Sequence, residues 1–82
     1  MDDSTVKIQF ELPGARVKDL EALMSLTGIT TRKDLFNNAL SLLEWAIRES
    51  YLGNMIASVD EKNEKFKQLV MPILSSAAKA AK

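Results

Sequence analysis

The sequence predicts a small, mostly helical protein with a short N-terminal strand, and three observations support this class. Residues 5–12 alternate between polar and apolar side chains, which is the period of a strand with one buried face. Apolar residues then recur at helical spacing in 15–27 and again in 32–52. Because a single strand cannot pair its own backbone groups, we expect it to pair with the same strand of a second copy. The result would be an antiparallel two-stranded ribbon in an intertwined homodimer.

Composition narrows the range of functions. A chain of 82 residues makes one small domain, near the size at which oligomerisation commonly supplements a limited core. The chain has no cysteine and no histidine, which excludes disulfides, thiolate nucleophiles, histidine acid–base catalysis and most zinc sites. Its formal net charge is zero, whereas dedicated nucleic-acid binders are more often basic. Binding depends on where charges lie rather than on their sum, so a local basic surface stays compatible with DNA binding.

The N-terminal strand is expected to end before Pro13 and Gly14, and its two faces differ in chemistry. One face would be polar and exposed, and the other would be apolar and buried. The polar face would carry Lys7, Gln9 and Glu11, and the apolar face Val6, Ile8, Phe10 and Leu12.

Two helices are expected next. The first should cover 15–27 and end at Gly28, because glycine readily takes the left-handed conformation that closes a helix. Thr31 and Asp34 resemble a capping box, so the second helix should cover about 32–52. Its apolar residues span a wide arc, which is typical of a helix wrapped on several sides, as in a dimer core. The predicted core stripe of this helix is Leu35, Ala39, Leu42, Leu43, Ala46 and Ile47.

The chain after the second helix is predicted to be a C-terminal extension, 54–82, distinct from an N-terminal dimerisation and DNA-binding domain, 1–53. Two strand-like stretches, 55–59 and 66–71, flank a charged turn, so we predict a β-hairpin that ends at Pro72. The tail that follows has high helix propensity but is too short to form a stable helix unaided.

The order and lengths of these elements resemble the ribbon-helix-helix superfamily, which includes the Arc, methionine and plasmid copy-number repressors. The resemblance covers roughly residues 5–52. It is carried by the alternating strand Val6–Leu12, by Gly28, Ile29 and Thr31, and by the apolar register Leu35, Ala39 and Leu43. Residues 35–60 also resemble a recurring group of small bacterial proteins of this type.

The resemblance implies an obligate dimer whose ribbon enters the major groove of double-stranded DNA. Its base-contacting residues would be Lys7, Gln9 and Glu11. Lys7 can donate to guanine O6 and N7, and Gln9 can pair with adenine N6 and N7. Glu11 departs from the basic or amide residues that relatives often carry there, and it could accept from cytosine N4 or repel phosphate.

The resemblance also implies contacts to the DNA backbone, from Thr5 at the ribbon edge and from Thr31, Arg32 and Lys33 at the start of the second helix. Free backbone N–H groups, the helix dipole and two cations together form a natural phosphate site. Such contacts set register and affinity without reading sequence. The structural alternative for these residues is an ordinary helix cap beside surface charges, and for the strand a merely solvated outer face.

Three interpretations of function follow. The first is a dimeric DNA-binding protein, either a transcriptional repressor or a nucleoid-associated factor. The second is an antitoxin-like or other interaction module that binds a partner protein through residues 54–82. The third is a monomeric α+β domain in which residues 55–59 or 66–71 pair with the first strand.

Catalysis is not expected. The sequence lacks a glycine-rich phosphate loop and any metal-ligand spacing, so we predict no catalytic residue, no cofactor and no metal site. The N-terminus lacks a basic segment followed by an apolar run, and the longest apolar stretch, 69–74, is too short to span a bilayer. We therefore expect a cytoplasmic protein at the nucleoid without membrane association.

Overall fold

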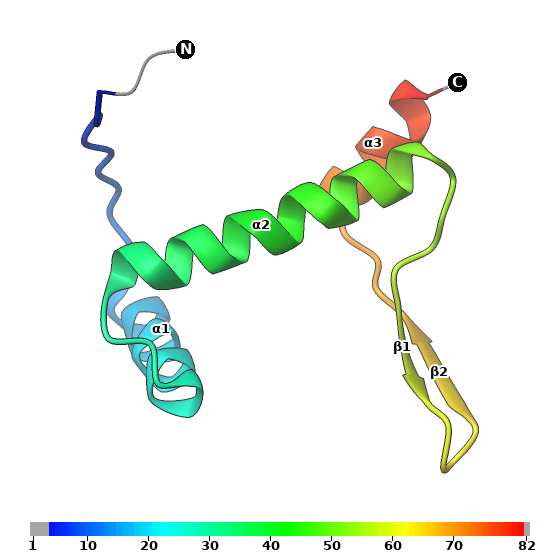
Figure 1. The fold of residues 1–82 in the computed structure, drawn as a ribbon, viewed down its shortest axis with the longest axis horizontal. Helices are drawn as coiled ribbons and strands as arrows, with labels where there is room; N and C mark the ends of the chain where they lie inside the picture. The colour runs from blue at the N-terminus through cyan, green and yellow to red at the C-terminus, as the bar shows by residue number, and fades with distance from the viewer. Residues whose placement is uncertain (1–3, 82) are drawn as a thin grey trace. The chain divides into compact units, whose positions relative to one another are not determined.

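The chain forms three helices and one two-stranded antiparallel sheet in the computed structural model, which describes residues 4–81 (Figure 1). In chain order they are α1 (Gly14–Thr27), α2 (Arg32–Tyr51), β1 (Ala57–Asp60), β2 (Lys65–Gln68) and α3 (Pro72–Ala80). The predicted mostly helical class is confirmed. The described residues fall into two compact units, one ending at Leu35 and the other beginning at Phe36. The predicted division after residue 53 stays a prediction.

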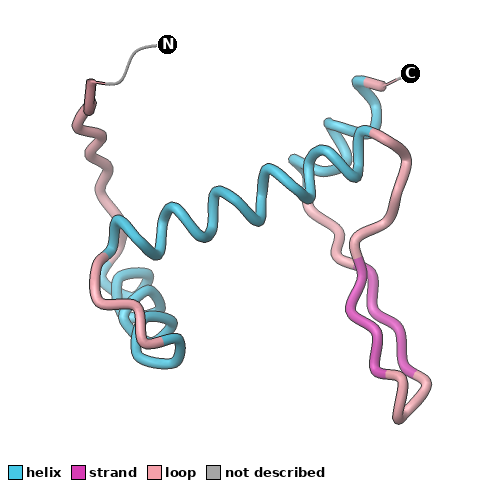
Figure 2. Tube along the Cα trace, viewed as in Figure 1, coloured by secondary structure: helices cyan, strands magenta, loops and turns pink. Residues whose placement is uncertain are grey.

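The N-terminal segment, 4–12, has no regular secondary structure within a single chain and is drawn as loop in Figure 2. The strand predicted over 5–12 is therefore not formed by one chain alone. In the described part of the chain the only ladder joins β1 to β2, so neither strand pairs with this segment as the monomeric interpretation required. A strand whose partner is a second copy cannot form in an isolated chain, and the intermolecular ribbon stays a prediction.

Helix α1 begins one residue earlier than expected, after Pro13. The Pro13 carbonyl accepts hydrogen bonds from the N–H groups of Arg16, at 2.9 Å, and Val17, at 3.2 Å. Gly28 closes the helix as predicted, because it adopts a left-handed φ of 76° and its N–H donates to the Met24 carbonyl at 2.9 Å. In the unit that ends at Leu35, the half-buried residues are Val17, Leu20, Met24, Ile29 and Leu35.

Helix α2 begins at Arg32, as the threonine cap predicted. The Asp34 N–H donates to the Thr31 hydroxyl at 3.1 Å, which satisfies one of the N–H groups that a helix start leaves unpaired. The helix ends at Tyr51, one residue before the predicted end, and Gly53 follows in a left-handed conformation with φ 87°.

The predicted C-terminal hairpin is confirmed, with shorter strands than expected. The pairs Val59↔Phe66 and Asp60↔Lys65 lie next to the turn, and Ala57↔Gln68 and Ser58↔Lys67 complete the register. The Asp60 carboxylate accepts from the Asn63 backbone N–H at 3.2 Å and from its side-chain amide at 2.9 Å. These two bonds fix the turn that joins the strands.

Helix α3 begins at Pro72, where the sequence predicted the end of the hairpin, and it includes most of the tail that was expected to be too short to form a stable helix unaided. Proline suits the first position of a helix, because its missing N–H would be unpaired there and its fixed φ is already helical. Leu74 is only 5% exposed, so this short helix is anchored by packing rather than by propensity alone.

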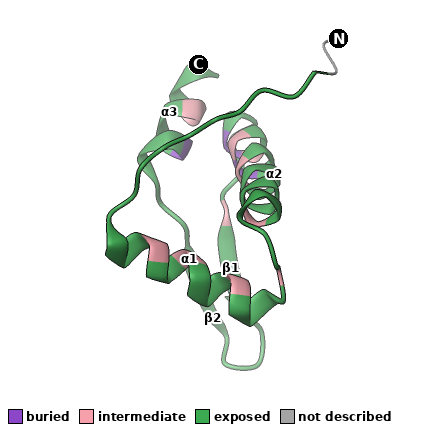
Figure 3. Cartoon of the chain, turned by 90° about the vertical axis from the view of Figure 1, so that its left-hand side faces the viewer, coloured by how far each residue is buried: buried purple, intermediate pink, exposed green. Residues whose placement is uncertain are grey.

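Few side chains are buried in the single chain. Within residues 4–81 only Ala46, Ser50 and Leu74 are buried, and all three belong to the unit that begins at Phe36. Figure 3 shows that exposed residues cover the N-terminal segment and nearly all of α1. The single chain therefore leaves most of its apolar side chains exposed. No helix in the described range is long and apolar enough to cross a membrane.

Candidate nucleic-acid interface

The polar residues of the N-terminal segment are accessible. Lys7, Gln9 and Glu11 are all exposed, and neither charged group takes part in an ion pair within residues 4–81. Thr5 is also exposed. The predicted base-contacting set is thus available to solvent, and its arrangement on one ribbon face depends on the pairing that a single chain does not form.

The apolar residues between them are exposed as well. Val6 is 76% exposed and Ile8 is 73% exposed, although large aliphatic side chains are among those most often buried. Phe10 is 63% exposed. The segment therefore combines an accessible polar set with an apolar set that one chain does not cover.

The start of α2 presents backbone donors. The Thr31 carbonyl accepts from the Leu35 N–H at 3.2 Å, and the Thr31 hydroxyl accepts from Asp34. The N–H groups of Arg32 and Lys33 have no hydrogen-bond acceptor in the described part of the chain. Two backbone donors and the positive end of the helix dipole therefore lie at this helix start without a partner in the described residues.

The two cations at this helix start are in different surroundings. Arg32 Nη2 lies 3.7 Å from Glu21 Oε1 of α1, and both side chains are largely exposed. Lys33 is exposed and forms no ion pair among residues 4–81. Asp34 adds a carboxylate in the same helical turn, which stabilises the helix start but lowers the local positive potential.

The pairing of Glu21 with Arg32 was not predicted from the sequence. Glu21 belongs to the first helix and Arg32 to the second, and no local pattern links the two. Only the turn through Gly28, which folds the chain back, brings the two side chains together.

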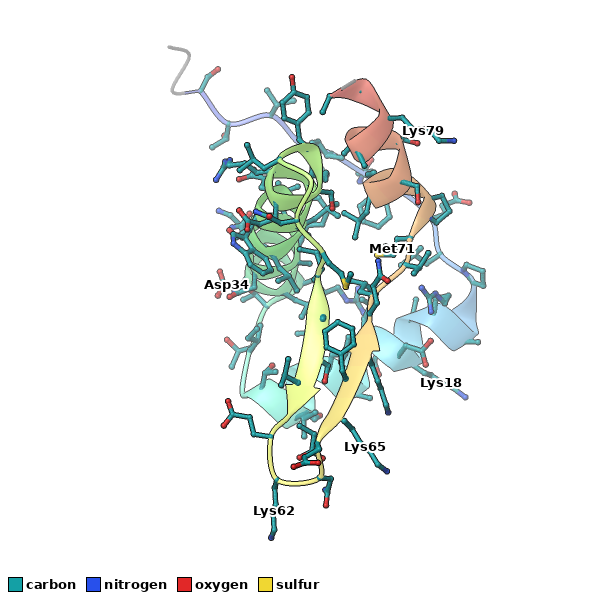
Figure 4. All side chains as sticks on the ribbon, turned by 90° about the vertical axis from the view of Figure 1, so that its right-hand side faces the viewer. Lys18, Asp34, Lys62, Lys65, Met71 and Lys79 are labelled. Atoms are coloured by element: carbon teal, nitrogen blue, oxygen red, sulfur yellow. The ribbon has the colours of Figure 1, made fainter. Side chains whose placement is uncertain are left out.

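The C-terminal hairpin has two unlike faces. Directly paired residues of an antiparallel sheet project to the same side, so Val59 and Phe66 share one face, whereas Asp60 and Lys65 share the other. Figure 4 shows Lys62 at the tip of the turn and Lys65 projecting from β2. Residues 60–64, which include the turn, are all exposed. Hydrogen bonds from the Asn63 side chain and backbone hold the pKa of the Asp60 carboxyl below its ordinary value.

A cleft of about 270 Å³ lies in the same unit as the hairpin. It is bordered by the end of α2, the segments that flank the hairpin, and α3, and Ser50, Met71 and Leu74 are among its lining residues. No charged side chain lines it. In the described residues no cluster of three or more acidic side chains could hold a metal ion.

Comparison with known proteins assigns no family to this chain, because no family model, no curated protein and no solved structure matches it. The resemblance to the ribbon-helix-helix superfamily therefore stays a prediction from residues and element order.

Proposed function

We propose that this protein is a dimeric DNA-binding protein, acting as a transcriptional repressor or nucleoid-associated factor. Its two N-terminal segments would pair as an antiparallel ribbon that enters the major groove. The N-termini of its two α2 helices would contact flanking phosphates.

The observation that carries the proposal is the exposure of the N-terminal apolar residues. Val6 and Ile8 are each about three-quarters exposed in the single chain, at 76% and 73%. Complete burial of such a side chain contributes at most about 1.5–3 kcal/mol. Pairing two copies would satisfy the backbone groups of the segment and cover these side chains in one step. The alternating pattern leaves Lys7, Gln9 and Glu11 on the opposite, outer face.

The chemistry of that outer face supports base readout. Each residue would appear twice, related by the two-fold axis, so a pseudo-palindromic site is expected. Lys7 suits guanine and Gln9 suits adenine, and each good bidentate contact discriminates by about 1–3 kcal/mol. Glu11 suits cytosine N4 and opposes phosphate, so it favours specific over non-specific binding.

The start of α2 supports phosphate contact. Among residues 4–81, the N–H groups of Arg32 and Lys33 have no hydrogen-bond acceptor and Lys33 has no ionic partner. Each cation that neutralises a phosphate adds about −0.9 to the slope of log affinity against log salt. Lys33 from two copies therefore contributes about −1.8 to that slope.

The test is fluorescence anisotropy of a labelled duplex titrated with the protein at two salt concentrations, together with light scattering for oligomeric state. We expect a dimer whose affinity falls steeply with salt. Lys33→Gln should weaken binding to all sequences similarly and flatten the slope by about 1.8. Lys79→Gln removes the same charge from an exposed position on α3 and should leave the slope unchanged. A monomer at micromolar concentration, or equal slopes for both variants, would contradict the proposal.

A second candidate is a protein-interaction module that binds a partner through residues 54–82. It is favoured by the paired side chains Val59 and Phe66, which are 64% and 61% exposed on one face of the hairpin. An isolated two-stranded hairpin is marginally stable in water, and a partner chain on this face would stabilise it. A dimer that binds no DNA even at low salt would favour this candidate over the first.

A further inference from the structure

The ion pair between Glu21 and Arg32 lies at the proposed phosphate contact. Arg32 is the first residue of α2, and its Nη2 atom lies 3.7 Å from Glu21 Oε1. The side chains are 67% and 62% exposed, so neither is held by burial. An anion that approaches the free N–H groups of Arg32 and Lys33 therefore meets a guanidinium that already has a carboxylate partner.

This pair has two consequences for an approaching phosphate. A phosphate would have to compete with the Glu21 carboxylate for the guanidinium, which arginine offers to phosphate in a bidentate contact. The Glu21 carboxylate would also repel the phosphate directly. Lys33 has no ionic partner within residues 4–81, so no carboxylate competes with a phosphate for its ammonium group.

We propose that Glu21 restrains DNA binding by holding Arg32 in an internal ion pair, which a DNA phosphate has to displace. This inference rests on the proposed function and divides the roles at the helix start. Lys33 and the backbone N–H groups contact phosphate whether or not the Glu21–Arg32 ion pair is formed. Arg32 contacts phosphate only when that ion pair is broken. Two such pairs occur in a dimer, one in each copy.

Because the Glu21–Arg32 ion pair is exposed, its removal should change DNA affinity only modestly. An exposed ion pair contributes a factor of about 1.4 to 5 to an equilibrium constant. Two pairs therefore limit the gain in DNA affinity on removing the restraint to about 2-fold to 25-fold. Because the pair is exposed, its removal should change the stability of the fold little.

The chain offers a matched control on the same helix. Arg16 Nη1 lies 3.3 Å from Asp19 Oδ2, and these side chains are 71% and 62% exposed. Asp19→Asn removes one negative charge and one exposed ion pair, as Glu21→Gln does. It does so without releasing a cation at the start of α2.

The experiment measures DNA affinity by anisotropy at about 50 mM salt for the wild type and the variants Glu21→Gln, Asp19→Asn, Arg32→Gln and the double variant Glu21→Gln/Arg32→Gln. We expect Glu21→Gln to raise affinity about 2-fold to 25-fold more than Asp19→Asn does. We further expect this excess to disappear when Arg32 is replaced, because the gain passes through the released guanidinium.

The outcomes separate the inference from the function on which it rests. Equal gains for Glu21→Gln and Asp19→Asn would overturn the inference, since a general charge effect would then suffice. A gain from Glu21→Gln that persists in the Arg32→Gln background would overturn it too, because Glu21 would then act by repulsion alone. If no variant binds DNA, the proposed function fails and this inference fails with it.

Discussion

Gly28 is the position where one added methyl group should have a predictable cost. Its φ of 76° lies in the left-handed region, and a Cβ built there meets no heavy atom within 4 Å. The cost of Gly28→Ala is therefore local strain between the new Cβ and the adjacent backbone, with no clash against residues beyond its chain neighbours. Placing an L-residue in the left-handed conformation costs about 1–2 kcal/mol.

The measurement is urea or thermal unfolding followed by circular dichroism at one fixed protomer concentration, because the stability of the proposed dimer would depend on concentration. In a domain of this size, Gly28→Ala should lower the thermal unfolding midpoint by about 4–8 °C for each kcal/mol by which it lowers the free energy of unfolding. Gly28→Asn should lower it less, since asparagine enters the left-handed region more easily than alanine.

The matched control is Gly14→Ala. Gly14 is the first residue of α1, its φ is not left-handed, and an added Cβ again meets nothing within 4 Å. This variant should leave stability unchanged or raise it by up to about 1 kcal/mol. A Gly28→Ala variant as stable as Gly14→Ala would refute the assignment of Gly28 as the obligatory left-handed end of α1.

Two further predictions concern the ribbon and the hairpin. Gln9→Ala should cost about 1–3 kcal/mol at the preferred site and relax base preference, and equal losses on specific and random duplexes would refute base readout by Gln9. Asn63→Ala should raise the pKa of the Asp60 carboxyl toward its ordinary value, because it removes the side-chain hydrogen bond that lowers this pKa most. Since the folded pKa is the lower one, Asp60 stabilises the hairpin above the ordinary aspartate pKa of about 4 and loses that effect as pH falls through the lowered value. A carboxyl-carbon NMR titration that gives the same pKa in both proteins would contradict this account.

The sequence by itself determined the elements whose signals are local. Gly28 and Thr31 mark a helix end and a helix start through their own backbone and side-chain chemistry, and both were placed correctly. The C-terminal hairpin followed from two strand-like stretches around a charged turn. Helix α3 was not predicted as a stable element, because Pro72 was taken as the end of the hairpin and not as the first residue of a helix.

The buried face of a helix could be identified only from the tertiary structure. The predicted stripe of α2 included Leu42 and Ala46, yet in the single chain Ala46 is buried and Leu42 is 64% exposed. Ser50, which lies outside that stripe, is buried and lines the same cleft as Leu74 of α3. A helix that is apolar over a wide arc does not specify which part of the arc a neighbour will cover.

In the candidate site, too, some features follow from the sequence and others depend on the tertiary structure. The residues proposed to contact DNA were chosen from the sequence alone, because donor and acceptor types are properties of single side chains. The pairing of Glu21 with Arg32 was decided only by the fold, since two exposed charges from different helices meet through the path of the chain between them. Alternation alone marks residues 5–12 as strand-forming, but a strand exists only where another strand supplies its hydrogen bonds.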